Sequence, residues 1–353
     1  MVPTALLNTA CGVKTSSFAV RKSHPHTRTS PRVQASTTSC EVTTAYKVTQ
    51  SPPKQGIRLQ VSGWRQSSPC TRLSIDSWLS LRRLRPQRSQ SATVVAMSSK
   101  APESEFTVVN GRNEKLAGLL VDAGDDTDVV IMCHGFMSHK NNTRNMALYP
   151  KLAERGVSSV RFDFAGNGSS EGEFDFGDYH REVEDLRYVV EAVRAKGRKV
   201  RAIMGHSKGG NTVLLYASKY DDVPLVCNVC GRFDVQSGVE ERFGPEGLER
   251  MKREGRIEQP LGDTKTYTVT YESLQKRLNT DMKAAVKGIN NTRIVTIHGT
   301  EDEIIPVEDA HEYNKVIKNH TMIIVNGADH RFHAEEHCRE LIQHLLDHIC
   351  PTT

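Results

Sequence analysis

Three residues whose types could together activate a nucleophile, Ser207, Asp302 and His330, each follow an apolar stretch of the chain. Ser207 is the centre of a Gly-His-Ser-Lys-Gly sequence that comes directly after the apolar residues 200–204. Glycines on both sides allow a tight turn between a strand and a helix, and a serine on such a turn projects its hydroxyl from the sheet. The five-residue pattern alone is a weak signal, so its context decides whether it carries chemistry.

The acid and the histidine have the context that this chemistry needs. The apolar run 293–297 leads into the loop that contains Asp302, and the apolar run 321–325 leads into the loop that contains His330. Each run is typical of a buried parallel strand. We therefore expect His330 to be the base that takes the Ser207 proton, and Asp302 to orient the His330 ring.

Neighbouring histidines and acids compete for these two roles. We expect His206 to point away from the hydroxyl, because it lies on the strand just before the turn, and His298 to pack inside the protein. His333 and His337 are predicted at the start of a helix, on its surface. The other acids of the two loops are Glu301, Glu303 and Asp329. Among all these acids, Asp302 alone combines a Gly-Thr-Glu-Asp position with a following Ile-Ile-Pro sequence.

Negative charge that develops on a carbonyl oxygen requires preorganised N–H donors. The residue after the nucleophile supplies one backbone N–H, so we assign this role to Lys208. The second donor is expected in the loop after the apolar run 129–133, where the Phe136 amide is the candidate. His134 in the same loop is predicted to be a structural hydrogen-bonding residue, and the Lys208 side chain is predicted to be solvated at the start of a helix.

Apolar strands and helical stretches alternate after residue 106, which predicts a parallel sheet covered on both faces. A hairpin of residues 106–109 and 116–121, flanking Asn110-Gly111, is expected to open this sheet. Further strands are expected at 129–133, 157–162, 200–204, 225–229, 293–297 and 322–325. Helices are expected at 143–154, 179–195, 208–219, 273–287, 308–317 and 333–349. The predicted fold class is α/β, with a mostly parallel eight-stranded sheet.

Residues 234–291 are too many for an ordinary crossover between two strands, and we predict that they form a small cap insertion. Residues 239–252 are helix-like, and residues 256–271 have the pattern of a hairpin that turns near Gly262-Asp263. An insertion at this point would lie over the carboxyl edge of the sheet, where ligands bind in open α/β folds. An ordinary surface elaboration is the alternative.

Charge divides the chain at about residue 97. The first 97 residues contain fourteen Lys or Arg and two acidic residues, whereas 33 basic and 40 acidic residues follow, so the formal net charge of +5 hides a basic leader. Ser and Thr fill 27 of the leader's positions. Such a segment buries too little apolar surface to fold and has the composition of an organelle transit peptide. We predict a disordered transit peptide at residues 1–97 and a folded domain at residues 98–353.

The leader favours a plastid as the destination. Its first charged residue is Lys14, so its start lacks the Arg-rich amphipathic face of a mitochondrial signal, and residues 94–97 resemble a plastid cleavage site. We expect the plastid import machinery as a partner and the chloroplast stroma as the location; if translation starts at Met97, the location is cytoplasmic. The scattered arginines offer no folded face to nucleic acid. No apolar run reaches the roughly 18 residues of a transmembrane segment.

The cysteines after the leader form no disulfide or metal framework. They are Cys133, Cys227, Cys230, Cys338 and Cys350. Cys227 and Cys230 have the spacing of a redox or zinc pair, but they lie in an apolar strand, where residues three apart face opposite sides. No second pair completes a metal site. We expect reduced thiols, no metal site and no cofactor.

Five segments of the chain resemble one known family. They are residues 134–136, 161–169, 205–210, 299–302 and 328–332. On these segments the chain resembles the serine esterase branch of the α/β-hydrolase superfamily, and is most like cinnamoyl/feruloyl-type esterases and plant esterase/lipase/thioesterase proteins. The segment 161–169 is similar to the family's Asp-x-x-Gly-x-Gly-x-Ser loop, in which Asp163 supports structure rather than chemistry.

The resemblance covers the chain after the leader and implies an α/β-hydrolase fold, a triad of Ser207, Asp302 and His330, and an oxyanion hole of Phe136 and Lys208. It implies a serine carboxylic ester hydrolase that cleaves a small-molecule acyl ester through an acyl-enzyme, without a cofactor. Lys208 departs from related esterases, which often have an uncharged residue such as Gln there. Two alternatives stay open: an acyl thioesterase, and a slow or non-catalytic ligand receptor on a hydrolase fold.

Overall fold

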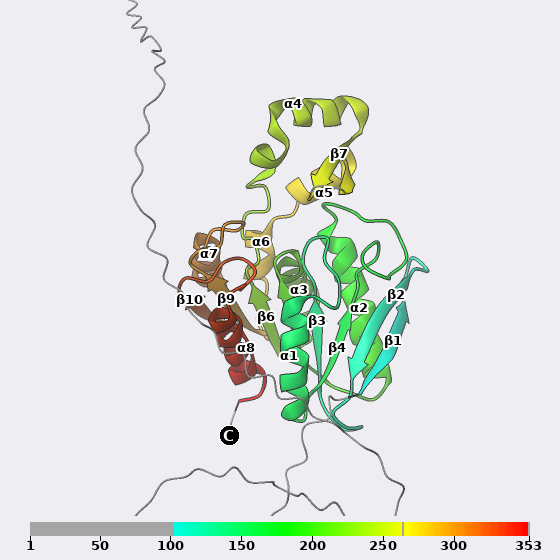
Figure 1. Cartoon of the computed structure of the whole chain (residues 1–353), viewed down its shortest axis with the longest axis vertical. Coiled ribbons are helices and arrows are strands. Elements are labelled where there is room, and N and C mark those ends of the chain that lie inside the picture. The colour runs from blue at the N-terminus through cyan, green and yellow to red at the C-terminus, as the bar shows by residue number, and fades with distance from the viewer. Residues whose placement is uncertain (1–101, 263–264, 352–353) are drawn as a thin grey trace, which may run out of the picture. The chain divides into compact units, whose positions relative to one another are not determined.

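The computed structural model describes residues 102–262 and 265–351 (Figure 1). The leader lies outside the described residues, so the transit peptide at residues 1–97 stays a prediction. In the part of the chain that is described, no helix has the length and apolar character needed to cross a bilayer.

An eight-stranded sheet in the order β1-β2-β4-β3-β5-β6-β9-β10 is the centre of the fold (Figure 1). Its strands are β1 (Glu103–Val109), β2 (Lys115–Val121), β3 (Val129–Cys133), β4 (Ser158–Phe162), β5 (Val200–His206), β6 (Leu225–Val229), β9 (Arg293–Gly299) and β10 (His320–Val325). The pairs β1–β2 and β2–β4 are antiparallel, and all other pairs are parallel. The prediction of a mostly parallel eight-stranded sheet is confirmed. Because the central strands run in one direction, their carboxyl ends share one edge.

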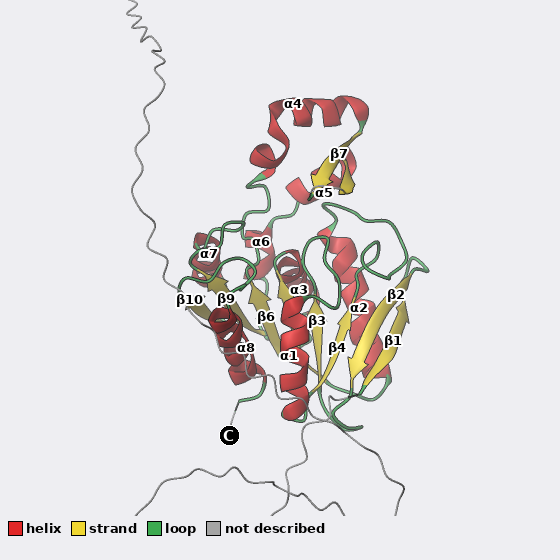
Figure 2. Cartoon of the chain, viewed as in Figure 1, coloured by secondary structure: helices red, strands yellow, loops and turns green. Residues whose placement is uncertain are grey.

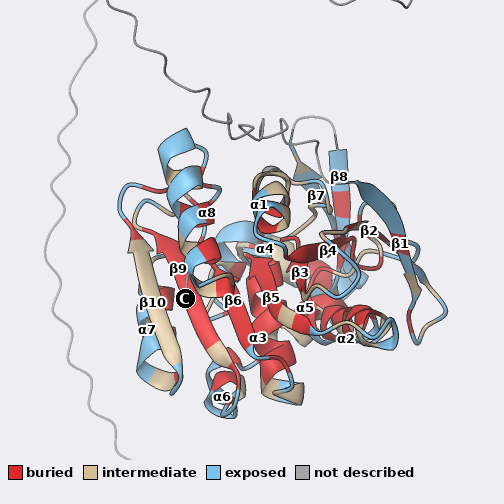
Figure 3. Ribbon diagram, turned by 90° about the horizontal axis from the view of Figure 1, so that it is seen from below, coloured by how far each residue is buried: buried red, intermediate tan, exposed pale blue. Residues whose placement is uncertain are grey.

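Helices cover both faces of this sheet, as Figures 1 and 2 show. They are α1 (Thr143–Glu154), α2 (Tyr179–Ala195), α3 (Lys208–Tyr220), α6 (Met282–Lys287), α7 (Glu308–Val316) and α8 (Glu335–Ile349). Helices α1 and α8 pack on one face, and α2, α3, α6 and α7 pack on the other. The central strands are therefore buried on both sides (Figure 3), which explains their continuous apolar sequences.

One local expectation differs from the structure. The helix expected at 273–287 is two helices, α5 (Tyr271–Leu278) and α6, because the Asp281 side chain accepts a hydrogen bond from Ala284 N–H and starts a new helix. The first hairpin forms as expected, and the left-handed residue of its turn is Asn113, with φ of 61°. Gly111 instead lies against Tyr188, whose hydroxyl would be 2.4 Å from a Cβ at that position.

The insertion at residues 234–291, called the cap below, comes between β6 and β9. It contains α4 (Val239–Glu254), the antiparallel hairpin of β7 (Arg256–Leu261) and β8 (Lys265–Thr270), α5 and α6. An apolar cluster joins cap residues Phe243 and Tyr267 to Phe136 and Phe176, which lie in loops after β3 and β4. These loops leave the carboxyl ends of their strands, so the cap packs on the edge of the sheet that carries the predicted site (Figure 1).

Asp163, directly after β4, is fully buried and anchors the loop that follows it. Its carboxylate accepts hydrogen bonds from the backbone N–H and Nζ of Lys140, both at 2.5 Å, and from Ser169 N–H at 2.9 Å. Gly168 passes so close that a Cβ there would lie 2.3 Å from Asp163 Oδ2. Asp163 thus has the structural role that the resemblance implied.

The substitution Asp163→Ala should strongly destabilise the fold, because it leaves the largely buried ammonium of Lys140 without its carboxylate. We expect the free energy of unfolding to fall by about 3–5 kcal/mol. Urea denaturation followed by circular dichroism measures this. Asp126→Ala, at an exposed loop position, is the control and should change stability by less than about 0.5 kcal/mol. Equal effects of the two substitutions would contradict the role given to Asp163.

Candidate active site

Ser207 lies in a strained turn between β5 and α3, with φ of 56° and ψ of −121°. Non-glycine residues rarely adopt such angles, and strain of this kind is often found at functional positions. The turn is held by hydrogen bonds from Ser207 N–H to Val229 O at 2.8 Å and from Asn211 N–H to Ser207 O at 3.2 Å. A Cβ at Gly205 would lie 2.1 Å from Gly209 O, so the close approach of these two backbones requires the first glycine of the motif.

Asp302 and His330 meet in the interior, after β9 and β10. Nδ1 of His330 lies 2.7 Å from Oδ2 of Asp302, and the Asp302 side chain is fully buried. Oδ1 of Asp302 accepts hydrogen bonds from the N–H groups of Ile304 and Ile305, at 2.9 and 2.7 Å. The neighbouring acids lie elsewhere: Asp329 binds His333, and Glu303 accepts from the His330 backbone.

The hydrogen bonds to Asp302 decide its charge. Burial would raise the pKa of Asp302, but hydrogen bonds from His298, His330 and the Ile305 N–H outweigh burial and bring this pKa far below its ordinary value. Asp302 is therefore a carboxylate, which only accepts hydrogen bonds. Nδ1 of His330 must then carry the ring proton, so Nε2 keeps the lone pair that a general base needs.

Two buried residues that the sequence analysis left out of the site support Asp302. Nε2 of His298 lies 3.1 Å from Asp302 Oδ2 and 3.0 Å from Ile305 O, so this nitrogen carries a proton toward two acceptors. The Cys230 thiol, at the end of β6, also lies beside Asp302, with its sulfur within 4.8 Å of a carboxylate oxygen. Burial and the Asp302 carboxylate raise the pKa of Cys230 well above its ordinary value, which keeps the thiol protonated.

These contacts revise two earlier expectations. His298 is buried as expected, but it contacts the acid rather than only packing. Cys227 and Cys230 were expected on opposite sides of the strand, but both pack in the same core cluster, and Cys230 also lies beside Asp302. The sequence signal that could have found His298 and Cys230 is position, since each lies at the carboxyl end of a parallel strand beside the loop of the acid.

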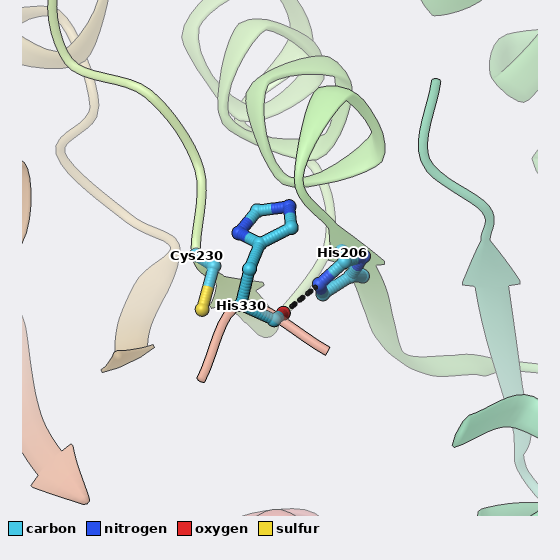
Figure 4. Close-up of side chains that lie close together, drawn as sticks. All are labelled: His206, Cys230 and His330. Atoms are coloured by element: carbon cyan, nitrogen blue, oxygen red, sulfur yellow. Dashed lines mark hydrogen bonds between the residues drawn. The ribbon is translucent and has the colours of Figure 1, made fainter. Parts of the chain in front are cut away.

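His206 holds the loop of His330 from the other side. Its Nε2 lies 2.8 Å from His330 O, and the two ring centroids are 4.8 Å apart. Burial lowers the pKa of His206 well below its ordinary value, so the ring is neutral and Nε2–H donates to the carbonyl. Figure 4 shows His206 and Cys230 on either side of the His330 main chain. His333 is exposed, as expected.

The same side chains include the two sets of three potential metal ligands found in the described residues. One set is His206, Cys230 and His330, and the other is Cys230, His298 and Asp302, each with its ligand atoms within 4.8 Å of one another. Nε2 of His206, Nε2 of His298, Nδ1 of His330 and both oxygens of Asp302 already form hydrogen bonds with protein atoms. Only Nδ1 of His206 and Nδ1 of His298 are buried without a partner among the described residues of these sets. The raised pKa of Cys230 opposes the thiolate that metals prefer. The arrangement fits a hydrogen-bond network better than a metal site.

Ser207 and His330 line the same cavity, which has a volume of about 770 Å³. No hydrogen bond joins the Ser207 hydroxyl to the His330 ring within residues 102–262 and 265–351. Catalytic hydrogen bonds are often long in ligand-free enzymes and tighten when substrate binds. The structure therefore brings Asp302 and His330 into contact and places Ser207 on the cavity that His330 also lines.

The backbone N–H groups of Phe136 and Lys208, residues that also line this cavity, have no hydrogen-bond partner among the described residues. His134 orients the first of them. Its Nε2 accepts from Phe164 N–H at 3.1 Å, so Nδ1 carries the proton and donates to Gly135 O at 2.8 Å. Because the carbonyl and the next N–H of a trans peptide point in opposite directions, this bond also fixes the direction of the Phe136 N–H.

The side chain of Lys208 differs from its expectation. It is buried rather than solvated, and Nζ lies 2.8 Å from Glu182 Oε1 and 3.2 Å from Asp175 O. The ammonium also lies 5.2 Å from the centre of the Tyr179 ring. Glu182 therefore neutralises this charge, and Lys208 keeps its predicted place at the start of α3 without adding a free cation to the cavity.

Comparisons with known proteins agree with this architecture. The family described as serine aminopeptidase, S33, matches residues 124–243, a range that includes Ser207. The structure of Est1E from Butyrivibrio proteoclasticus with bound ferulic acid superposes with a TM-score of 0.57 at 19% identity, over 69% of this chain and 98% of that one. The chain has the α/β-hydrolase fold.

Two curated relatives are similar over most of the folded part. The bifunctional esterase/perhydrolase DCH of Acinetobacter calcoaceticus is 22% identical over 58% of this chain and 86% of that protein. The mitochondrial palmitoyl-protein thioesterase ABHD10 of Homo sapiens is 21% identical over 62% of this chain and 72% of that protein. By name, these relatives are an esterase and a thioesterase.

The charge of Asp302 makes stability depend on pH. Its pKa is lower in the folded protein than the ordinary value of about 3.9, so the carboxylate stabilises the fold fully above about pH 4 and less as pH falls below that. Asp302→Asn removes this contribution. We expect the difference in free energy of unfolding between wild type and Asp302→Asn to be largest near pH 7 and to shrink toward pH 3, as measured by urea denaturation. A difference that stays constant or grows in acid would contradict the assigned charge.

Proposed function

We propose that the protein is a serine hydrolase that cleaves carboxylic esters through an acyl-enzyme on Ser207. The observation that carries the proposal is the 2.7 Å hydrogen bond between the Asp302 carboxylate and His330 Nδ1, beside a cavity that Ser207 also lines. The strained turn at Ser207 and the two unpartnered N–H groups of Phe136 and Lys208 support the same assignment.

In the first half of the reaction, Nε2 of His330 accepts the hydroxyl proton as Ser207 Oγ attacks the acyl carbon. A bond forms between Oγ and this carbon, and the electron pair of the carbonyl moves to its oxygen. The N–H groups of Phe136 and Lys208 stabilise this oxyanion. The Asp302 carboxylate stabilises the imidazolium that His330 has become.

In the second half, the carbonyl reforms and the bond to the leaving alcohol breaks. His330 gives its proton to the departing oxygen, which leaves the acyl group on Ser207. A water molecule then repeats the attack with His330 again as base, and the acid product leaves as Ser207 regains its proton. Every proton that His330 takes is returned, so the cycle needs no cofactor.

A thioesterase is the second candidate, because the human relative is named a palmitoyl-protein thioesterase. The same residues would cleave a thioester, since only the leaving atom changes from oxygen to sulfur. Est1E, in contrast, was solved with bound ferulic acid, which is a carboxylic acid, and the similarity to Est1E supports the ester candidate. Comparison of kcat/KM on an acyl ester and on the matching acyl-CoA separates the two candidates.

Fluorophosphonate labelling tests the nucleophile. We expect the purified folded segment, residues 98–353, to be labelled on Ser207, because an activated serine attacks the phosphorus and cannot release it. Ser207→Ala should lose the label and reduce ester turnover by about 10⁶-fold, while circular dichroism stays unchanged. Ser104→Ala, an exposed residue on β1, should label like wild type. An unlabelled wild type that still binds a ligand tightly would contradict the proposal and favour a receptor.

We also propose that residues 1–97 direct the protein into plastids, on the basis of their basic, Ser/Thr-rich and acid-poor composition. A fluorescent reporter fused to residues 1–97 should accumulate in chloroplasts of transfected plant cells. The same reporter fused to residues 98–353 is the control and should stay outside them. A diffuse cytosolic signal from the first fusion would remove this proposal and indicate a start at Met97.

A further inference from the structure

Three arginines from three separate segments line the cavity of the proposed active site. Arg232 follows β6, Arg242 is on the cap helix α4, and Arg277 is on the cap helix α5. In the described part of the chain, no carboxylate lies within ion-pair distance of any of these guanidiniums. They differ in this from Lys208, whose ammonium is neutralised by Glu182.

The rest of the cavity wall does not balance these charges. Its further cationic residues are Arg144 and Arg331, and its one acid among the described residues is Glu335. Glu335 in turn faces Arg339 at 3.6 Å. The cavity therefore carries an excess of positive charge, although residues 98–353 contain more acidic than basic residues.

Neutral groups hold the three arginines in place. Arg277 Nη1 donates to the Tyr179 hydroxyl, whereas its buried Nε has no partner among the described residues. The guanidinium carbons of Arg277 and Arg242 lie 5.4 and 5.8 Å from the centre of the Phe176 ring. Arg232 Nη2 donates to Ile304 O. Stacking on a ring fixes the direction of a guanidinium and leaves its N–H groups available to a ligand.

The three guanidinium groups repel one another. Burial and the charges of Arg277 and Arg242 lower the pKa of Arg232, and the attraction of Asp309 only partly opposes them. Like charges that share a partly buried site repel each other more strongly than in water. A bound anion would remove this repulsion and satisfy the free N–H groups.

We propose that these arginines bind a carboxylate or phosphate group of the substrate, so that the enzyme prefers acyl esters or thioesters that carry such an anionic group. Guanidinium groups bind both anions with paired hydrogen bonds, and such charge-assisted bonds are strong. The inference rests on the proposed function, because the arginines and Ser207 line the same cavity. It adds a specificity determinant to a site whose chemistry needs no arginine.

Matched substrate pairs test the preference. For a carboxylate, the pair is mono-4-nitrophenyl adipate and its neutral methyl ester; for phosphate, it is butyryl-CoA and butyryl-N-acetylcysteamine. We expect kcat/KM to be higher by about tenfold or more on the charged member of at least one pair, which corresponds to about 1.4 kcal/mol. The pair that shows the effect identifies the anion. Added NaCl should reduce the preference, because salt screens charges.

Arginine variants assign the preference to these side chains. Arg242→Gln and Arg277→Gln should each lower the ratio of kcat/KM on the charged substrate to that on the neutral one by about fivefold to tenfold. Arg242→Lys should retain part of the ratio, because it keeps the charge. Arg250→Gln, an exposed position of the same helix α4 that faces Glu254, should leave the ratio unchanged. If the arginines served only to pack the cap, both substrates would lose activity equally and the ratio would stay constant, which would overturn the inference.

Failure of the inference is distinguishable from failure of the proposed function. Ser207-dependent hydrolysis without preference for the charged member of either pair overturns the inference alone. Absence of any Ser207-dependent hydrolysis overturns the proposed function. In that case, calorimetry of adipate with Ser207→Ala tests the anion site directly. Binding that is lost in Ser207→Ala/Arg242→Gln supports it, and no binding, or equal binding by both variants, contradicts it.

Discussion

The buried carboxylate of Asp302 is the group on which the rest of the site depends. A carboxylate removed from water is costly unless several donors surround it. Here the donors come from the loop after β9, from His330 after β10 and from His298 on β9, and the protonated thiol of Cys230 after β6 lies beside them. Each donor lies at the carboxyl edge of a parallel strand, so the sheet order β5-β6-β9-β10 is what gathers them. The satisfied carboxylate then fixes which nitrogen of His330 is free to act as base.

At this edge of the sheet, the strand ends and the cap contribute different groups to the proposed active site. Strand ends and the loops directly after them supply Ser207, His330, Asp302 and the two N–H groups of the proposed active site, all held by short backbone connections. The cap supplies Arg242, Arg277 and the aromatic cluster with Phe136 and Phe176, which shape the space in front of Ser207. A cap can therefore change which acyl compounds enter the cavity without disturbing the hydrogen bonds of Asp302. The proposed reaction type therefore depends on the strand ends, and substrate preference depends on the cap.

Much of the fold follows from local sequence. Strand β3 and helices α1 and α2 have the expected bounds, because their apolar periodicity changes sharply at both ends. Two of the contacts that the sequence left open depend on tertiary structure. The Lys208–Glu182 ion pair joins two helices, and Cys230 approaches Asp302 from β6, which only the sheet order makes a neighbour of β9. The His298–Asp302 bond joins residues four apart in sequence, at the end of β9. The break between helices α5 and α6 has a local cause, because Asp281 caps the start of α6. An aspartate at this position is the sequence signal that could have predicted the break.

The central claim is that Ser207 becomes acylated with His330 as its base. Mass spectrometry of peptides after acid quenching of a reaction with 4-nitrophenyl acetate tests this most directly. The account predicts an acetyl group on the peptide that contains Ser207 at short reaction times in the wild type, and little acetylation of this peptide in His330→Ala. An acetyl group that forms on a different residue, or hydrolysis that proceeds while Ser207 stays unmodified at all times, would contradict it.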